Sequence, residues 1–309
     1  MINRFIILLK IGRKLAQSGI LDIFSKFHEV PKSIRLLFYL LSFSLKKRDE
    51  INVNIDEKER LSNSLQSMGT TFIKLGQFLA TRPDIIGEDL SKQLETLQDK
   101  LPPFSLYEAK NIIKKDLGDQ MFNSIINLSE PVAAASIAQV HKAQIDDNGT
   151  IKDVAVKILR PQIKKIFNDE IDALMFFAYV IESLIKKTKR LKLVEVTFLL
   201  KQITNHEMDL RFEAAAANEY AENTKNDLGF KVPSIYWNFT SENVMTLDWI
   251  EGNSIRETEI LQSQNIDTNK IATDIIQHFL RHAVRDGFFH ADMHQGNIFV
   301  DKNGQIIPI

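Results

Sequence analysis

The sequence predicts an α+β fold, in which helices precede a small antiparallel sheet and further helices follow it. Apolar residues recur three and four apart through residues 56–128, which is the period of a helix. Short β-branched runs flank a polar turn at 146–149 and predict a β-hairpin. Long helical patterns cover 162–186 and 195–224, and residues 231–250 return to short runs typical of strands.

The composition is that of an ordinary globular chain, with 309 residues, a net charge of −1 and no cysteine. This length is enough for one large domain or two smaller ones. The lack of cysteine excludes disulfides, thiolate metal sites and a cysteine nucleophile, and it fits a reducing cytosolic compartment. Because the total charge is near neutral and no nucleic-acid module is recognisable, we expect no nucleic-acid partner.

The beginning of the chain is basic, since residues 1–48 contain ten Lys or Arg and only two acidic residues. Apolar stretches at 5–9 and 36–45 lie between these charges, and both are too short to span a bilayer. The first runs into basic residues instead of a small-residue cleavage site, so no secretion signal is predicted. A helix lying on an anionic membrane surface and a helix packed on the protein fit this pattern equally well.

The strongest chemical signal is the segment 290–297, HADMHQGN, which precedes a predicted hairpin at 298–307. Its frame, H-x-D-x-x-x-x-N, is that of a kinase catalytic loop. There, Asp292 would position or deprotonate an attacking hydroxyl, and Asn297 would hold Mg²⁺ on the nucleotide phosphates. Alternatively, these polar residues could simply satisfy the hydrogen bonds of a buried turn.

A second signal is the segment 154–157, VAVK, which matches the V-A-x-K of the third kinase strand. In that strand the lysine, here Lys157, clamps the α and β phosphates. The short pattern alone is common in any strand with one solvated face. Its place in the chain favours the kinase interpretation, because a helix with acidic residues at 206–218 and then the loop at 290–297 follow in the order that kinase chemistry requires.

Three further motifs give the chain a resemblance to the UbiB or ADCK group of atypical kinases. The segment 74–77 reads KLGQ, the family's K-x-G-Q. The segment 133–141, AAASIAQVH, stands where other kinases have a glycine-rich loop, and the segment 207–214, EMDLRFEA, contains an E-x-D element followed by Glu-Ala. The resemblance covers residues 56–309.

The resemblance implies a protein-kinase-like fold with an N-lobe that holds a small antiparallel sheet, family-specific N-terminal helices, and a helical, incomplete C-lobe. We expect a basic amphipathic region at 1–55 and a helical K-x-G-Q extension at 56–130. The N-lobe with inserted helices would cover 131–252, and the partial C-lobe with the catalytic loop would cover 253–309.

The resemblance also implies roles for individual residues. Lys157 would pair with Glu213 and order the phosphates of ATP, and Asp292 and Asn297 would act in the catalytic loop, with Asn297 as a ligand of Mg²⁺. A hinge at 244–252 would meet the adenine edge with its backbone. The other residues implied near the nucleotide are Ala133, Ala134, Ala135, Ser136, Asp248, Trp249 and Ile250.

A family regulatory motif is implied as well, in which Glu207 and Asp209 face Lys74 and Gln77. Lys74 and Gln77 are three residues apart and therefore share one face of a helix. In the family these helices are understood to cover the place where a protein substrate would dock.

Alanine in place of glycine restricts the backbone that would close over the phosphates, because each Cβ narrows the allowed conformations. We therefore expect ATP hydrolysis or a small lipid-like substrate instead of ordinary protein-kinase activity. The resemblance implies a role in ubiquinone (coenzyme Q) biosynthesis, with a membrane surface, a lipid or quinone intermediate, and quinone-biosynthesis enzymes as partners. It implies a peripheral location on the cytoplasmic face of the inner membrane.

One expected residue is missing from the sequence. Kinase-like proteins place a second magnesium-binding Asp, in Asp-Phe-Gly, directly after the hairpin strand, which here would be roughly the residue after Ile309. The expectation is therefore a chain truncated before that Asp. Its turnover would be impaired, because the phosphate charge would be neutralised from one side only.

Three other interpretations remain open. A non-catalytic nucleotide-binding scaffold for lipid-pathway enzymes is favoured by the missing Asp and opposed by the intact catalytic loop. A hydrolase metal cluster could use His290, Asp292 and His294, since alternate residues of an extended segment can face one ion. A small-molecule kinase of the choline or aminoglycoside type has a similar catalytic loop, but the segments 74–77 and 133–141 oppose it.

Overall fold

The computed structural model describes most of the chain from residue 57 onward, and the described residues are 6, 9–13, 57–95, 97, 101–147, 149–184 and 186–309. The predicted basic region at 1–55 thus lies almost wholly outside the described residues. Within the described part, no helix has both the length and the apolar character needed to cross a membrane.

The described chain divides into two compact units, which are considered separately. The first contains the described residues of 1–101 together with 135–137 and 162–206. The second contains the described residues of 102–134, 138–161 and 207–309.

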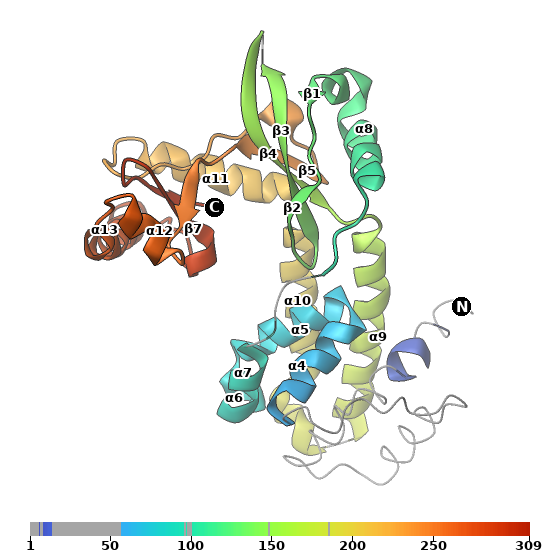
Figure 1. The fold of residues 1–309 in the computed structure, drawn as a ribbon. Coiled ribbons are helices and arrows are strands. Elements are labelled where there is room, and N and C mark those ends of the chain that lie inside the picture. Colours follow the sequence, from blue (N-terminus) through green and yellow to red (C-terminus); the bar gives the residue numbers. More distant parts are fainter. Residues whose placement is uncertain are drawn as a thin grey trace. The chain divides into compact units, whose positions relative to one another are not determined.

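The first unit is helical (Figure 1), and its core joins α4, α5 and α7 to α9. Gly69 separates α4 from α5 and has a φ of 106°, a value that residues other than glycine rarely adopt. Phe72 and Ile73 of α5 are fully buried. The helices are α4 (Glu57–Met68), α5 (Thr70–Ala80), α6 (Pro83–Ile86), α7 (Glu88–Glu95), α9 (Ile163–Leu184), η1 (Lys186–Leu191) and α10 (Leu193–Glu207).

The second unit contains an antiparallel sheet with the strand order β1-β3-β4-β5, and β2 pairs with β3. The predicted hairpin is confirmed as β3 and β4, which pair from Ala138 opposite Leu159 to Asp147 opposite Thr150. The strands are β1 (Ile125–Ile126), β2 (Pro131–Ala134), β3 (Ala138–Asp147), β4 (Thr150–Leu159) and β5 (Val244–Asp248).

One face of this sheet is covered by α8 (Leu106–Asn123). Val154, Val156 and Ile158 of β4 are fully buried in the core that α8 shares with the sheet. Because successive side chains of a strand point to opposite faces, Lys157 projects from the face away from α8. The strand thereby presents a lysine on the side of the sheet that its core leaves open.

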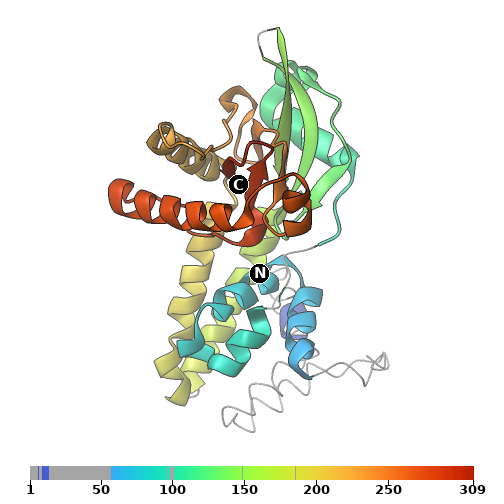
Figure 2. The same cartoon turned by 60° about the vertical axis from the view of Figure 1, so that its left-hand side comes forward.

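The rest of the second unit is a three-stranded antiparallel sheet, in the order β6-β7-β8, with helices packed on it. Figure 2 shows α13 along its length, close to the end of the chain. The predicted C-terminal hairpin is confirmed as β7 and β8. These elements are β6 (Gly252–Ser254), α12 (Thr258–Ser263), α13 (Thr268–Arg281), a π-helical turn η3 (His282–Asp286), η4 (Gln295–Asn297), β7 (Ile298–Asp301) and β8 (Ile306–Pro308).

The helix predicted at 195–224 is wrong in one respect, because the structure has two helices there, α10 and α11 (Leu210–Thr224). The break falls at Asp209, whose φ and ψ of −128° and 97° are extended. Its side chain accepts a hydrogen bond from the backbone N–H of Arg211 and so caps the new helix. Apolar periodicity continued across the break and concealed it.

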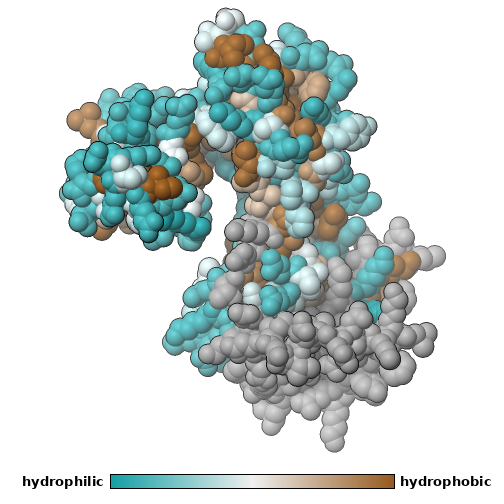
Figure 3. Space-filling model, in the orientation of Figure 1, coloured by the Kyte–Doolittle hydropathy of each residue, from teal (hydrophilic) through white to brown (hydrophobic). Residues whose placement is uncertain are grey.

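The surface of the second unit is mostly hydrophilic in the view of Figure 3, and hydrophobic residues appear on it as separate patches. One set lies on α13 and the turn that follows it, where Ile276, Leu280 and Val284 are spaced four residues apart and exposed. Nothing among the described residues covers this stripe.

Candidate active site

Lys157 of β4 and Glu213 of α11 form an ion pair in the second unit. The Nζ of Lys157 donates to both carboxylate oxygens of Glu213, at 2.6 and 2.7 Å. Their side chains keep 26% and 47% of their surface exposed. Residues 56 positions apart in sequence are thus paired as expected, and the lysine remains accessible to an anionic ligand.

The alanine-rich segment forms the turn between β2 and β3. Ala133 and Ala134 belong to β2, where they pair with Val140 and Gln139 of β3. The turn residues 135–137 belong to the first unit, in which the hydroxyl of Thr70 donates to the carbonyl oxygen of Ser136 at 3.1 Å.

Ser136 itself is fully buried, so its side chain is not presented to solvent. Ala135 is half-buried. The predicted nucleotide contacts of these residues remain predictions.

Behind this turn, Gln139 is buried and fixes the start of α8 to the sheet. Its amide oxygen accepts from the N–H of Phe104 at 2.9 Å, and its Nε2 donates to the carbonyl of Phe104 at 3.1 Å. The same Nε2 lies 2.9 Å from the Nε2 of His141, and burial lowers the pKa of His141. A neutral imidazole accepts this hydrogen bond, whereas a protonated one cannot.

The predicted hinge at 244–252 includes β5, and two of the three backbone N–H groups of residues 248–250 are already used inside the protein. The N–H of Asp248 donates to the carbonyl of Ser234 at 3.0 Å, and that of Trp249 donates to the carbonyl of Asp153 at 3.1 Å. The carboxylate of Asp248 accepts from the hydroxyl of Tyr236 at 2.7 Å. That the backbone of residues 248–250 meets an adenine edge remains a prediction.

Asp292 and Asn297 lie together in the predicted catalytic loop. The Nδ2 of Asn297 donates to the Oδ2 of Asp292 at 2.8 Å and to its carbonyl at 3.3 Å. Both hydrogen bonds use the nitrogen of the amide, so they leave the amide oxygen of Asn297 beside a carboxylate. Hard oxygen ligands of this kind suit Mg²⁺, and the donor set therefore fits the expected metal.

The catalytic loop is held in place by its neighbours. The carbonyl of Gln295 accepts from the hydroxyl of Ser254 at 2.9 Å, and the N–H of Asn297 donates to the carbonyl of His294 at 2.8 Å. The imidazole of His294 accepts from the N–H of Gly296 at 3.2 Å and lies 3.0 Å from a guanidinium nitrogen of Arg256. A Cβ at residue 296 would lie 3.1 Å from this guanidinium nitrogen, so the glycine permits the close approach.

The contacts of His294 weigh against a metal cluster made of His290, Asp292 and His294, since its imidazole is already used within the loop. Among the described residues, these three do not form a group of adjacent ligand atoms. His290 is half-buried, and its Nδ1 is buried without a hydrogen-bond partner among the described residues.

The residues of the predicted regulatory motif lie in different units. Lys74 and Gln77 are half-buried on α5 of the first unit, on either side of Gly76. A Cβ on Gly76 would lie 3.0 and 3.1 Å from methyl groups of Leu65 and Leu97, so the glycine allows α5 to pack closely.

Glu207 and Asp209 belong to the second unit. Besides capping α11, Asp209 forms an ion pair with Arg211 at 2.7 Å. That Glu207 and Asp209 face Lys74 and Gln77 remains a prediction.

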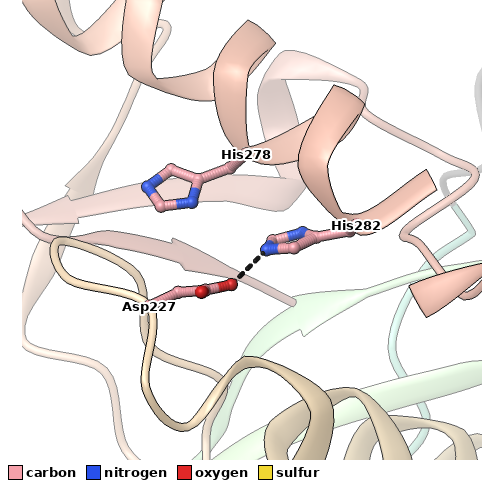
Figure 4. A group of neighbouring side chains, drawn as sticks. All are labelled: Asp227, His278 and His282. Atoms are coloured by element: carbon pink, nitrogen blue, oxygen red, sulfur yellow. Dashed lines mark hydrogen bonds and ion pairs between the residues drawn. The ribbon is translucent and has the colours of Figure 1, made fainter. Parts of the chain in front are cut away.

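A buried group that the motifs did not predict lies at the end of α13, where His278 and His282 approach Asp227 (Figure 4). The Nε2 of His282 is 2.9 Å from Asp227, and its Nδ1 is 2.8 Å from the hydroxyl of Tyr220. Arg285 contacts both oxygens of Asp227, at 2.7 and 2.9 Å. The sequence signal was the pair of histidines four residues apart, but their partners are more than fifty residues away.

The electrostatics of this group follow from burial and from the arginine. Hydrogen bonds from Arg285 lower the pKa of Asp227 to about 2. Burial lowers the pKa of His282 and of His278, and it raises the pKa of Tyr220 to about 12, against the effect of a backbone hydrogen bond at His290. Two neutral imidazoles and a carboxylate could ligate a metal ion, but Arg285 already occupies both carboxylate oxygens.

Comparisons with known proteins show which family this chain belongs to. Residues 96–309 match the family described as the ABC1 atypical kinase-like domain. A probable protein kinase UbiB of Marinobacter nauticus is 34% identical over 93% of this chain and 52% of its own length. Proteins of the same name from Azotobacter vinelandii and Pseudomonas paraeruginosa are 37% and 33% identical, over 78% and 97% of this chain.

The two latter proteins are matched over 44% and 56% of their own length, so the chain spans about half the length of these relatives. The family match covers the sheet, α11 and the catalytic loop, and it confirms the predicted protein-kinase-like α+β fold. The chain belongs to the ABC1 atypical kinase-like family and is similar over most of its length to proteins named UbiB.

Proposed function

We propose that the protein binds Mg-ATP and acts as an ATP-dependent phosphotransferase or ATPase of the atypical kinase type. The observation that carries the proposal is the ion pair of Lys157 with Glu213, which lies in the same compact unit as the paired side chains of Asp292 and Asn297. In phosphoryl transfer the protein does little covalent chemistry. It positions the reacting groups and neutralises the charge of the phosphates.

Each residue has a distinct task in this proposal. Glu213 orients Lys157, whose ammonium group binds the α and β phosphates. The amide oxygen of Asn297 would hold Mg²⁺, which supplies positive charge to the phosphate oxygens. The carboxylate of Asp292 would position or deprotonate a hydroxyl or water that attacks the γ-phosphorus.

The proposed biological role is support of ubiquinone biosynthesis, because the chain is similar to proteins named UbiB. The proposed partners are a lipid or quinone intermediate at a membrane surface and enzymes of the same pathway. The alanine-rich turn at 133–136 favours hydrolysis or a small substrate over a protein substrate, since Cβ atoms limit how the backbone closes on phosphates.

Nucleotide affinity tests the proposal directly, and turnover is the second readout, because these 309 residues include a single magnesium-binding side chain of the motif, Asn297. Lys157→Met should weaken binding of Mg-ATP by at least about tenfold, because hydrogen bonds to charged groups contribute about 1.5–3 kcal/mol. Lys152→Met is the matched control, since Lys152 lies on the same strand and is also ion-paired, with Asp147 at 2.7 Å.

If both variants bind Mg-ATP as the unsubstituted chain does, Lys157 is not the phosphate clamp. A non-catalytic scaffold is the competing proposal, and Asp292→Asn separates the two. Turnover that is present in the chain and abolished by Asp292→Asn excludes the scaffold, whereas turnover that is unchanged in Asp292→Asn excludes the proposed role of Asp292.

A further inference from the structure

The helix that carries Glu213 also carries Tyr220, seven residues further along. Seven residues of an α-helix turn through nearly two full turns and rise about 10.5 Å, so both side chains start from nearly the same side of α11. Glu213 reaches the β3–β5 sheet through Lys157, whereas Tyr220 is buried in the core formed with α12, α13 and β7. One helix therefore contacts both parts of the second unit (Figure 1).

Tyr220 is bound to the end of α13 by a directional chain of hydrogen bonds. Its hydroxyl lies 2.8 Å from the Nδ1 of His282, and the Nε2 of His282 lies 2.9 Å from the carboxylate of Asp227. The ionised carboxylate can only accept, so the Nε2 of His282 carries the proton. The Nδ1 of a neutral imidazole then accepts from the phenol, and each group donates to the next one.

The chain of hydrogen bonds is closed by Arg285. Its guanidinium binds both oxygens of Asp227 and both oxygens of Asp286, the latter at 2.6 and 2.7 Å. Arg285 also donates to the carbonyl of Asn223, at the end of α11, at 3.2 Å. The end of α11 and the turn η3 are thus joined by several charged contacts instead of by apolar packing alone.

The turn η3 leads directly into the catalytic loop. It ends at Asp286 and is followed by Gly287, which has a φ of 64°, and the loop begins at His290. A π-helical turn inside a helix is uncommon and is frequently found at functional sites. The backbone of His290 lowers the pKa of Tyr220, against the rise caused by burial.

We propose that Tyr220, His282 and Asp227 form a positioning network that sets the catalytic loop relative to the Lys157–Glu213 pair. The proposal rests on the function proposed above and adds Tyr220 as its central positioning residue. The network joins α11, which carries Tyr220, to the turn η3, which precedes the catalytic loop with Asp292. Displacement of the loop would leave Lys157 and Glu213 in place but would move the metal ligand Asn297.

A simpler explanation is that Tyr220 merely fills the core. Its ring does pack against Phe230 and Phe288, with centroids 5.5 and 6.2 Å away. A phenylalanine would make these ring contacts equally well, so the hydroxyl is what distinguishes the two explanations. A buried hydroxyl without a partner costs free energy, and here the partner is a fully buried imidazole.

Tyr220→Phe in the 309-residue chain tests the proposal, with hydrogen exchange of residues 287–297 as the first readout. We expect exchange there to become about fivefold faster, because one buried hydrogen bond contributes about 1 kcal/mol. Tyr236→Phe is the matched control, since the hydroxyl of this half-buried tyrosine also donates a hydrogen bond to a side chain, the carboxylate of Asp248. The control should alter exchange near residues 234–248 and leave residues 287–297 unchanged.

This readout needs no nucleotide, so it stays informative if the chain fails to bind Mg-ATP. Where Mg-ATP does bind, Tyr220→Phe should raise the Mg²⁺ concentration needed for half-maximal binding while metal-free ATP affinity stays unchanged. Exchange at 287–297 that is unchanged, or that rises equally throughout the chain, overturns the proposal.

The unsubstituted chain gives an independent check through the nitrogen chemical shifts of His282. The network predicts a neutral imidazole with its proton on Nε2. A proton on Nδ1, or a charged imidazole at neutral pH, would contradict the direction of the hydrogen bonds and with it the proposal.

Discussion

The two groups of charged residues in the second unit differ in exposure. The Lys157–Glu213 pair keeps about a quarter to a half of its side-chain surface exposed, whereas His282 has none exposed and Asp227 has 6%. Exposed pairs contribute about 0–1 kcal/mol to stability, while loss of one partner of a buried pair costs several kcal/mol. The exposed pair can therefore change partners when an anion binds, and the buried group is suited to hold the scaffold fixed.

The largest effect is expected from removing the buried carboxylate. Asp227→Ala should lower the free energy of unfolding by about 3 kcal/mol, because it leaves the buried His282 without its acceptor and removes one of the two carboxylates that bind Arg285. Urea denaturation measures this loss. Asp172→Ala is the comparison, since Asp172 forms an exposed pair with Lys201 and should cost less than about 1 kcal/mol. Equal losses in both variants would erase the distinction between buried and exposed pairs.

Acid should destabilise the folded chain through its buried histidines. The pKa values of His141, His278 and His282 are lowered by burial, so the unfolded chain binds more protons than the folded one below pH about 6.5. Stability is then fully present above that pH and falls as the pH decreases. Each of these histidines contributes at most about 1.4 kcal/mol per pH unit.

Urea midpoints at pH 7.5 and 5.5 measure this dependence. His278→Leu should reduce this pH dependence, since the variant lacks one buried titrating group. The Nδ1 of His278 has no hydrogen-bond partner among the described residues, so the substitution breaks no hydrogen bond of that atom. An undiminished pH dependence in this variant would show that His278 is not neutral in the folded chain at these pH values.

The cap of α11 offers a smaller test that separates two roles of Asp209. Asp209→Ala should cost about 1 kcal/mol through loss of the cap, as should Asp267→Ala, which removes the corresponding cap of α13. Asp209→Asn should preserve stability, because asparagine caps as well as aspartate. If the charge of Asp209 faces Lys74 and Gln77, Asp209→Asn will change nucleotide affinity with stability unchanged.

The smallest effect on stability is expected at the exposed pair. Glu213→Gln should change the free energy of unfolding by less than about 1 kcal/mol, because Glu213 is half-exposed. Its effect should be seen in Mg-ATP affinity, since the lysine loses the carboxylate that orients it. A large loss of stability without a change in affinity would assign the pair a structural role.

The exposed pair of Lys157 and Glu213 could be predicted from the sequence, because the motifs that indicate it are local. The turn at 146–149 and the β-branched runs beside it predict the hairpin that carries Lys157. The order of segments 154–157, 206–218 and 290–297 then indicates the partner and the loop. Glu213 was named from the resemblance, and the structure pairs it with Lys157.

The buried group around His282 could not be predicted in this way. Tyr220 and Asp227 contact His282 from positions 62 and 55 residues away, and no spacing rule connects them. The break at Asp209 was missed because apolar periodicity runs through it, although an Asp followed by helix-forming residues is a possible cap signal. Side-chain networks of this kind depend on tertiary packing, which one sequence does not display.

The most direct test of the proposed function is a calorimetric titration of the 309-residue chain with ATP, with and without Mg²⁺. The account predicts saturable binding that Mg²⁺ strengthens, and an Asn297→Ala variant in which Mg²⁺ no longer strengthens it. Asn303→Ala, in the turn between β7 and β8, should bind as the unsubstituted chain does. Absence of ATP binding in the unsubstituted chain, or an unchanged effect of Mg²⁺ in Asn297→Ala, would contradict it.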